Sequence, residues 1–303
     1  SNKIKEYVSR VKELGMNSAA ITDHGVMYGV IDFYREARKQ GIKPILGCEV
    51  YVAPNSRFDR ETAGGESRYH HLVLLAENNT GYANLMKIVS RGFTEGYYYK
   101  PRVDKDLLRQ YHEGIIALSA CLAGEVQRYL SRGLTEKAKK VALEYQDIFG
   151  KGNFFLEMQD HGIPEQQLVN QRQIQLSKET GIELVVTNDI HYTYAEDAKP
   201  HDILLCIQTG KKLDDENRMR YEGGQYYVKS PQEMEALFPY AKQALENTQK
   251  IANRCEVEIE FGVTKLPKYD VPDGMTSWEY LNKLCWEGLE KHYGEPSREL
   301  KER

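Results

Sequence analysis

The chain has 303 residues, 41% hydrophobic and 28% charged, the usual balance of a soluble globular protein with one large domain or one domain plus a smaller one. Its 41 basic and 45 acidic side chains give a formal net charge of -4, which argues against a surface devoted to gripping duplex DNA. No apolar run approaches the roughly 20 residues that cross a bilayer, so the sequence predicts no membrane partner.

The cysteines indicate the redox environment. There are five, an odd number, and none forms a CxxC pair: Cys48, Cys121, Cys206, Cys255 and Cys285. This pattern is unlike a disulfide framework or a zinc ribbon and favours the reducing cytoplasm. We expect most of them to be ordinary packing residues.

The first element is predicted to be a helix, because apolar residues recur at three- and four-residue spacing from Ile4 to Leu14 before Gly15. Buried strands are then predicted at 18–23, 45–52, 71–76, 114–119, 154–158 and 183–187. Helical patterns lie among them at 30–41 and 82–89, after the strand at 114–119 up to 149, and at 166–178. Such alternation implies parallel βαβ units, and six repeats favour a closed or nearly closed barrel over an open sheet.

The last part of the chain changes character. A turn-rich connector over 266–274 is followed by a capping-box signature from Thr276 to Glu279. An amphipathic helix with Trp278 and Leu281 on one face is expected next, and Ser297 begins another. We therefore expect one domain over 1–265, and over 266–303 a connector with the first helices of a further domain. Both ends are expected to be cuts, because no strand precedes the first helix and the last amphipathic helix lacks neighbours to pack against.

Residues with metal-binding side chains follow several of the predicted strands. They occur in Thr22-Asp23-His24-Gly25, Gly47-Cys48-Glu49-Val50, Ser119-Ala120-Cys121-Leu122 and Thr187-Asn188-Asp189-Ile190-His191-Tyr192. The carboxyl ends of parallel strands converge on one site, and His, Glu, Cys and Asp are metal ligands by type. His70-His71 is an exception, because it opens a predicted strand.

Each motif alone also has an ordinary structural explanation. A single histidine beside a strand can be a satisfied polar residue, and Thr-Asp-His-Gly can be a turn with a helix cap. Cys121 can be a small buried hydrophobe. Asp189 and His191 carry more weight, because alternation along a strand places them on the same face. Ligand-type clusters at successive strand ends together favour a metal site.

These motifs, in this order, resemble the PHP (polymerase and histidinol phosphatase) domain. The resemblance is sharper to the family of bacterial DNA polymerase III alpha subunits, through segments 157–165, 196–198 and 201–210. It implies an α/β fold, a distorted (βα)7 TIM-like barrel with a small α-helical C-terminal extension. It also implies up to three metal ions, Zn²⁺, Mn²⁺ or Fe²⁺.

The resemblance implies a role for each ligand-type residue. His24 and His191 match ligands of one metal, Glu49 matches a bridging ligand, and Asp189 belongs with it at another ion. His71 and Cys121, with Glu49, match the third. Asp23 is expected to orient its neighbour from outside the ligand set. His70 and His161 are weaker candidates.

One part of the family pattern is expected upstream of Ser1. The family opens with a His-x-His strand and an acidic turn, which supply further ligands, so the first strand of the barrel is expected to be missing. The third metal site is then the only one whose named ligands are all present. We expect these residues to bind metal incompletely and to show little or no hydrolysis.

The resemblance implies that the chain is a fragment of a replicative DNA polymerase. Nucleotidyl transfer would belong to the parent, on carboxylates beyond Arg303 that hold Mg²⁺, and the partners would be primer-template DNA, the sliding clamp and other replisome subunits. The PHP domain would be a phosphoesterase-type domain. Its role would be a 3′–5′ proofreading exonuclease, or a structural one that docks a separate exonuclease. The alternative is a free-standing phosphoesterase such as a histidinol phosphatase.

Overall fold

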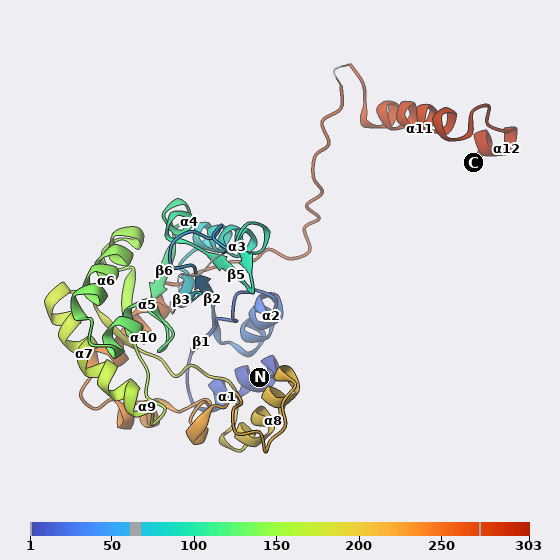
Figure 1. The fold of residues 1–303 in the computed structure, drawn as a ribbon. Coiled ribbons are helices and arrows are strands. Elements are labelled where there is room, and N and C mark those ends of the chain that lie inside the picture. Colours follow the sequence, from blue (N-terminus) through green and yellow to red (C-terminus); the bar gives the residue numbers. More distant parts are fainter. Residues whose placement is uncertain (1, 61–67, 273) are drawn as a thin grey trace. The chain divides into compact units, whose positions relative to one another are not determined.

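The computed structural model describes residues 2–60, 68–272 and 274–303 (Figure 1). The chain forms two compact units, Ser1–Glu258 and Ile259–Arg303. The second contains helices α11 (Ser277–Tyr293) and α12 (Arg298–Glu302). The predicted capping box is present at the start of α11, where Thr276 and Glu279 satisfy each other's backbone N–H groups. None of the helices in the described ranges is long and apolar enough to cross a membrane.

The first unit is built on a curved sheet. Its strands are β1 (Ser18–Ile21), β2 (Lys43–Val52), β3 (His70–Ala76), β4 (Tyr97–Tyr98), β5 (Lys100–Val103), β6 (Ile115–Leu118), β7 (Phe154–Met158) and β8 (Leu184–Val186). They are ordered β4-β5-β2-β3-β6-β7-β8, and β1 also pairs with β2. No pairing joins β1 to β8 within the described ranges, so the sheet curls as half of a barrel. The predicted α/β class is confirmed.

Helices surround this sheet (Figure 1). The α-helices are α1 (Ile4–Glu13), α2 (Val30–Gln40), α3 (Asn79–Thr94), α4 (Lys105–Gln110), α5 (Glu125–Ser131), α6 (Thr135–Phe149), α7 (Pro164–Thr180), α8 (Ala198–Thr209), α9 (Pro231–Leu237) and α10 (Lys242–Arg254). Two single turns of 3₁₀ helix lie at Ala195–Asp197 and Glu222–Gly224. The hairpin of β4 and β5 and helices α4, α9 and α10 were not among the predicted elements.

Helix α2 illustrates how the sequence pattern specifies local structure. Its apolar residues recur at helical spacing, and Val30, Phe33, Tyr34 and Ala37 are all buried. Gly41 ends the helix with a φ of 77°, a left-handed conformation that glycine adopts without steric cost. Burying one such large apolar side chain contributes about 1.5–3 kcal/mol, so packing rather than propensity holds α2 in place.

The central strands are buried on both faces. Along β3, Leu72 and Leu74 belong to a core shared with α3, α5, α6 and α7, whereas Val73 and Leu75 belong to a second core with Ile251 of α10. This explains why the strands read as continuous apolar runs rather than alternating patterns. It leaves the ends of the strands as the place where polar side chains can gather.

The direction of β3 differs from the expected parallel arrangement. It runs antiparallel to both β2 and β6, with Val52 opposite His70 and Tyr51 opposite His71. The described parts of the connection from β2 to β3 contain no helix, and a parallel pairing needs a crossover of that kind. The start of β3 therefore lies at the edge where β2 ends, which brings the exceptional histidine pair to the same edge.

Gly81 allows α3 to approach the turn before β6. A Cβ atom at Gly81 would lie 1.7 Å from the backbone oxygen of Gly114, whereas one at Gly92, in the same helix, would meet nothing closer than 3.5 Å. We expect Gly81→Ala to lower the free energy of unfolding by about 2–3 kcal/mol, because backbone cannot yield as a side chain can. Gly92→Ala is the matched control and should be neutral or stabilising. Urea denaturation followed by circular dichroism measures both, and equal midpoints would contradict the steric argument.

Candidate metal centre

The ligand-type residues gather where several segments meet at one edge of the sheet. After β1 ends, the chain continues beside β2, and His24 forms a parallel bridge with Glu49. His71, the second residue of β3, forms a bridge with Gly124, at the end of the loop that follows β6. His71 also pairs with Tyr51, two residues from Glu49, so backbone pairing makes His24, Glu49 and His71 neighbours, although His24 and His71 are 47 positions apart.

Glu49 is the centre of the cluster. Its Oε1 atom lies 3.0 Å from Nδ1 of His24 and 2.5 Å from Nδ1 of His71. The donor atoms of these three residues all lie within 4.8 Å of one another. Glu49 is 5% exposed, whereas the side chain of His24 is 43% exposed. The cluster is therefore open to solvent on the His24 side and closed behind the carboxylate.

The charges of the cluster are mutually stabilising. Burial favours the neutral acid, but hydrogen bonds from His24 and His71 outweigh it and hold the pKa of Glu49 below its usual value. The hydrogen bond with Glu49 in turn raises the pKa of His24. The carboxylate is thus ionised, and an imidazole contacts it on each of two sides. A cation in this position would be attracted by the carboxylate and could bind the imidazole nitrogens beside it.

The other predicted ligands extend the cluster in two directions. Cys121 Sγ lies 3.5 Å from His71 Nδ1. The ring of His191 lies 5.8 Å from that of His24, and its Nε2 is 3.2 Å from Asp189 Oδ1. Burial, reinforced by Glu49 and Asp189, raises the pKa of the Cys121 thiol well above its usual value. Within the described residues the compact group is His24, Glu49 and His71, and Cys121, Asp189 and His191 lie next to it.

The donor set suits divalent metal ions. It combines imidazole nitrogens, carboxylate oxygens and one thiol, the ligands that proteins use for Zn²⁺ and related transition metals. The residues are held by strands and short loops rather than by a flexible segment, and Glu49 can offer both oxygens. The chemistry and closeness of the side chains fit a metal centre.

Asp23 and His70 lie beside the cluster rather than within it. The backbone oxygen of Asp23 accepts a hydrogen bond from the Glu49 N–H, 3.0 Å away, and burial raises the pKa of its carboxyl group. His70 projects to the opposite face of β3 from His71 because strand side chains alternate. Burial, with the nearby charges of Arg128 and Lys105, lowers its pKa to about 4.

His161 has both ring nitrogens engaged away from the cluster. Nε2 donates to the backbone oxygen of Asn188 at 2.8 Å, and Nδ1 accepts from the Gln166 side chain at 2.9 Å. The Asn188 side chain also accepts from Lys229 Nζ at 3.1 Å. His161 therefore fixes the backbone of Asn188, the residue before Asp189. The backbone of Asp189 itself has a φ of 44°.

Two neighbours of the site were not singled out from the sequence. Glu157, at the end of β7, is 4% exposed and contacts two of the loops that carry ligands. Lys229 is 5% exposed, and burial lowers its pKa to about 8. A glutamate next to the end of an otherwise apolar strand was the available signal for Glu157. Lys229 lies in an irregular segment after the barrel elements, where periodicity carries no information.

Comparison with known proteins adds independent findings. The sequence profile of the PHP domain matches residues 1–161. The DNA polymerase III subunit alpha of Treponema pallidum is 44% identical over 304 residues, covering 100% of this chain and 26% of that protein. The subunits named in the same way from Borreliella burgdorferi and Thermus aquaticus are 43% and 41% identical, covering 99% and 96% of this chain and 26% and 24% of theirs.

The chain thus spans about a quarter of the length of the curated relatives that it matches. Among solved structures, an amidohydrolase from Chromobacterium violaceum is similar with a TM-score of 0.43 and 13% identity. The match covers 63% of this chain and 82% of that one.

Proposed function

This chain belongs to the PHP domain family, and we propose that it is the metal-binding, phosphoesterase-type part of a bacterial DNA polymerase III alpha subunit. The observation that carries the proposal is the position of Glu49 Oε1, shared between His24 and His71. A buried, ionised carboxylate flanked by two imidazoles is an arrangement that a divalent cation stabilises.

We assign the six clustered residues as ligands. Glu49 would bridge, with His71 and Cys121 on one side and His24, Asp189 and His191 on the other. Imidazole and thiolate donors favour Zn²⁺, and Mn²⁺ and Fe²⁺ are the other candidates. When bound, such ions supply Lewis-acid activation of water and neutralise charge at a phosphate ester. His24, the most exposed of the central three, faces the side from which a substrate would enter.

The substrate class follows from the family of the relatives. Proteins named DNA polymerase III subunit alpha match nearly the whole chain, so the proposed substrate is a phosphodiester at a nucleic acid 3′ end rather than a small phosphate ester. Polymerisation, with its Mg²⁺, would reside elsewhere in a longer parent protein. Primer-template DNA, a sliding clamp and other replisome subunits are the proposed partners, in the cytoplasm.

Cobalt substitution tests the metal centre. The metal-free chain titrated with Co²⁺ should develop a thiolate-to-cobalt charge-transfer band, because Cys121 is the cysteine beside the cluster. Cys121→Ser should abolish this band and weaken binding. Cys255→Ser is the matched control, because Cys255 is also buried but lies in the core beside α10. A band that survives Cys121→Ser, or wild-type protein that binds no Co²⁺, would overturn the assignment.

A further inference from the structure

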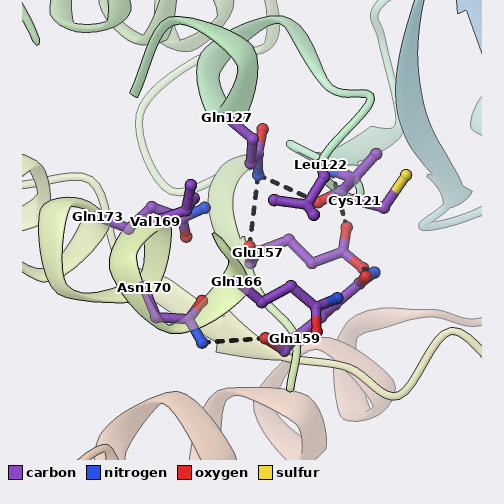
Figure 2. A pocket seen from close by; sticks show the side chains of 10 residues that line it. Cys121, Leu122, Gln127, Glu157, Gln159, Gln166, Val169, Asn170 and Gln173 are labelled. Carbon is purple, nitrogen blue, oxygen red and sulfur yellow. Dashed lines mark hydrogen bonds between the residues drawn. The ribbon is translucent and has the colours of Figure 1, made fainter. Parts of the chain in front are cut away.

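Glu157 occupies the end of the strand that separates two of the ligand-bearing loops. Strand β7 pairs in parallel with β6 on one side and with β8 on the other. The loop after β6 carries Cys121, and the loop after β8 carries Asp189 and His191. Figure 2 shows the Glu157 side chain directed toward the loop of Cys121.

Each carboxylate oxygen of Glu157 is tied to a different loop. Oε2 accepts a hydrogen bond from the backbone N–H of Ala120, 2.9 Å away. Oε1 accepts from the hydroxyl of Thr187 at 2.5 Å and from the Gln159 amide at 3.2 Å. Ala120 directly precedes Cys121, and Thr187 lies two residues before Asp189. One side chain therefore joins the backbone beside Cys121 to the Thr187 side chain near Asp189.

Both loops contain a backbone conformation that needs external support. Ala120 has a φ of 63° and Asp189 a φ of 44°, in the left-handed region that side chains other than glycine's disfavour. Such conformations persist where surrounding contacts over-determine them, and they cluster at functional sites. The hydrogen bonds to Glu157 come from the backbone of Ala120 itself and from Thr187, two residues before Asp189.

Packing alone does not explain a carboxyl group here. Glu157 is 4% exposed, and its described hydrogen-bond donors are neutral groups: a backbone amide, a hydroxyl and a side-chain amide. Burying a carboxyl group without a basic partner costs free energy, and an apolar side chain of the same size would avoid that cost. What the carboxyl group adds is the ability to bind both loops at once.

We propose that Glu157 is a positioning residue that fixes the loops of Cys121 and Asp189 in the arrangement that binds metal. The inference rests on the proposed metal centre, which it deepens by naming a residue outside the ligand set that determines metal affinity. Gln127 supports the same turn, because its Nε2 donates to the backbone oxygens of Ala120 and Glu157 at 3.0 and 3.4 Å. Residues of this kind typically change metal affinity by about 10–100-fold.

Four variants of the 303-residue chain separate positioning from stability. Glu157→Met keeps the side-chain volume and removes the hydrogen bonds to Ala120 and Thr187, so Co²⁺ affinity should fall about 10–100-fold. Glu157→Gln keeps an acceptor for Ala120 and a polar partner for Thr187, so affinity should return close to that of the wild type. Thr187→Val removes the hydrogen bond from Thr187 to Glu157, so it should weaken Co²⁺ binding while leaving the thiolate band intact.

Gln173→Met is the matched control. Gln173 is 1% exposed and lines a pocket that Glu157 and Cys121 also line (Figure 2). Neither of its side-chain polar atoms has a hydrogen-bond partner in the described part of the chain. Its replacement should leave metal affinity unchanged.

The readouts are Co²⁺ affinity against a competing chelator, the intensity of the thiolate band, and the melting temperature of the metal-free protein. A purely structural role would lower the melting temperature without changing the affinity of the folded protein. Wild-type affinity in both Glu157→Met and Thr187→Val would overturn the inference while leaving the metal centre intact. Absence of Co²⁺ binding by the wild type would overturn the proposed function and this inference with it. If Glu157→Met does not fold, Thr187→Val still decides.

Discussion

Replacing Glu49 by glutamine is expected to lower the metal affinity of the chain by more than roughly 100-fold, since loss of an outer partner alone costs about 10–100-fold. Oε1 of Glu49 is the atom that both His24 and His71 contact, so its replacement removes the centre of the cluster. The amide presents one weaker oxygen and an NH₂ group that repels a cation. The pKa of His24 should also fall, because its hydrogen bond with the carboxylate is the main cause of its elevation.

Glu125→Gln is the matched control for this prediction. Glu125 is also a buried glutamate of the first unit, but it pairs with Lys105 and Tyr145 rather than with the cluster. Its replacement should cost stability and leave metal affinity unchanged. Isothermal titration with Zn²⁺ or Mn²⁺ gives the affinities, and NMR titration gives the pKa of His24. Equal affinity in Glu49→Gln and the wild type would remove Glu49 from the ligand set.

The same substitution separates two activities in a protein with the length of the curated relatives. Glu49→Gln should abolish metal-dependent removal of nucleotides from a single-stranded 3′ end and leave DNA synthesis on a primed template intact. If synthesis is lost in parallel with hydrolysis, the cluster serves the structure of the polymerase instead. If neither protein removes nucleotides, the hydrolytic part of the proposal fails.

The second large effect concerns pH and Glu157. Burial raises the pKa of this carboxyl group from 4.5 to about 7, and Glu49 and Asp189 add to the shift, against the hydrogen bond from Thr187. The folded protein therefore holds this proton more tightly than the unfolded chain. The stabilisation is fully present below about pH 4.5 and is lost as pH rises through about 7. The difference in pKa corresponds to about 3 kcal/mol.

Glu157→Gln removes this titration while preserving the shape of the side chain. The unfolding free energy of the wild type, measured relative to that of Glu157→Gln in chelator, should fall by about 3 kcal/mol between pH 4.5 and 7.5. Histidines that titrate in the same range cancel in the difference. Urea denaturation at several pH values gives the two curves, and parallel curves would show that Glu157 does not titrate in this window.

Much of the local structure follows from sequence patterns. The apolar spacing of α2 and its terminal Gly41 predict a helix that the structure places at Val30–Gln40, and the capping box at Thr276 predicts the start of α11. These features depend on neighbours three or four residues away, so a linear pattern contains them. The short strands β4 and β5, of two and four residues, lack such a pattern, because strands this short are specified by their pairing partners.

The direction of β3 is not encoded in its own residues. Its apolar run predicts a strand, but nothing in that run indicates whether the strand is parallel or antiparallel. If β3 were parallel to β2, as expected, His70 and His71 would lie at the end of the sheet away from the other ligand-type residues. The antiparallel pairing with β2 resolves this, because Tyr51 lies opposite His71.

The sequence by itself determined the α/β class and the kinds of side chain that gather at the strand ends, because both are properties of residue type and short-range order. Only the tertiary structure decided that one oxygen of Glu49 serves both His24 and His71, and that Glu157 reaches two loops. Such contacts join residues far apart in the chain. They arise from strand register and direction, which the packing of the whole sheet selects.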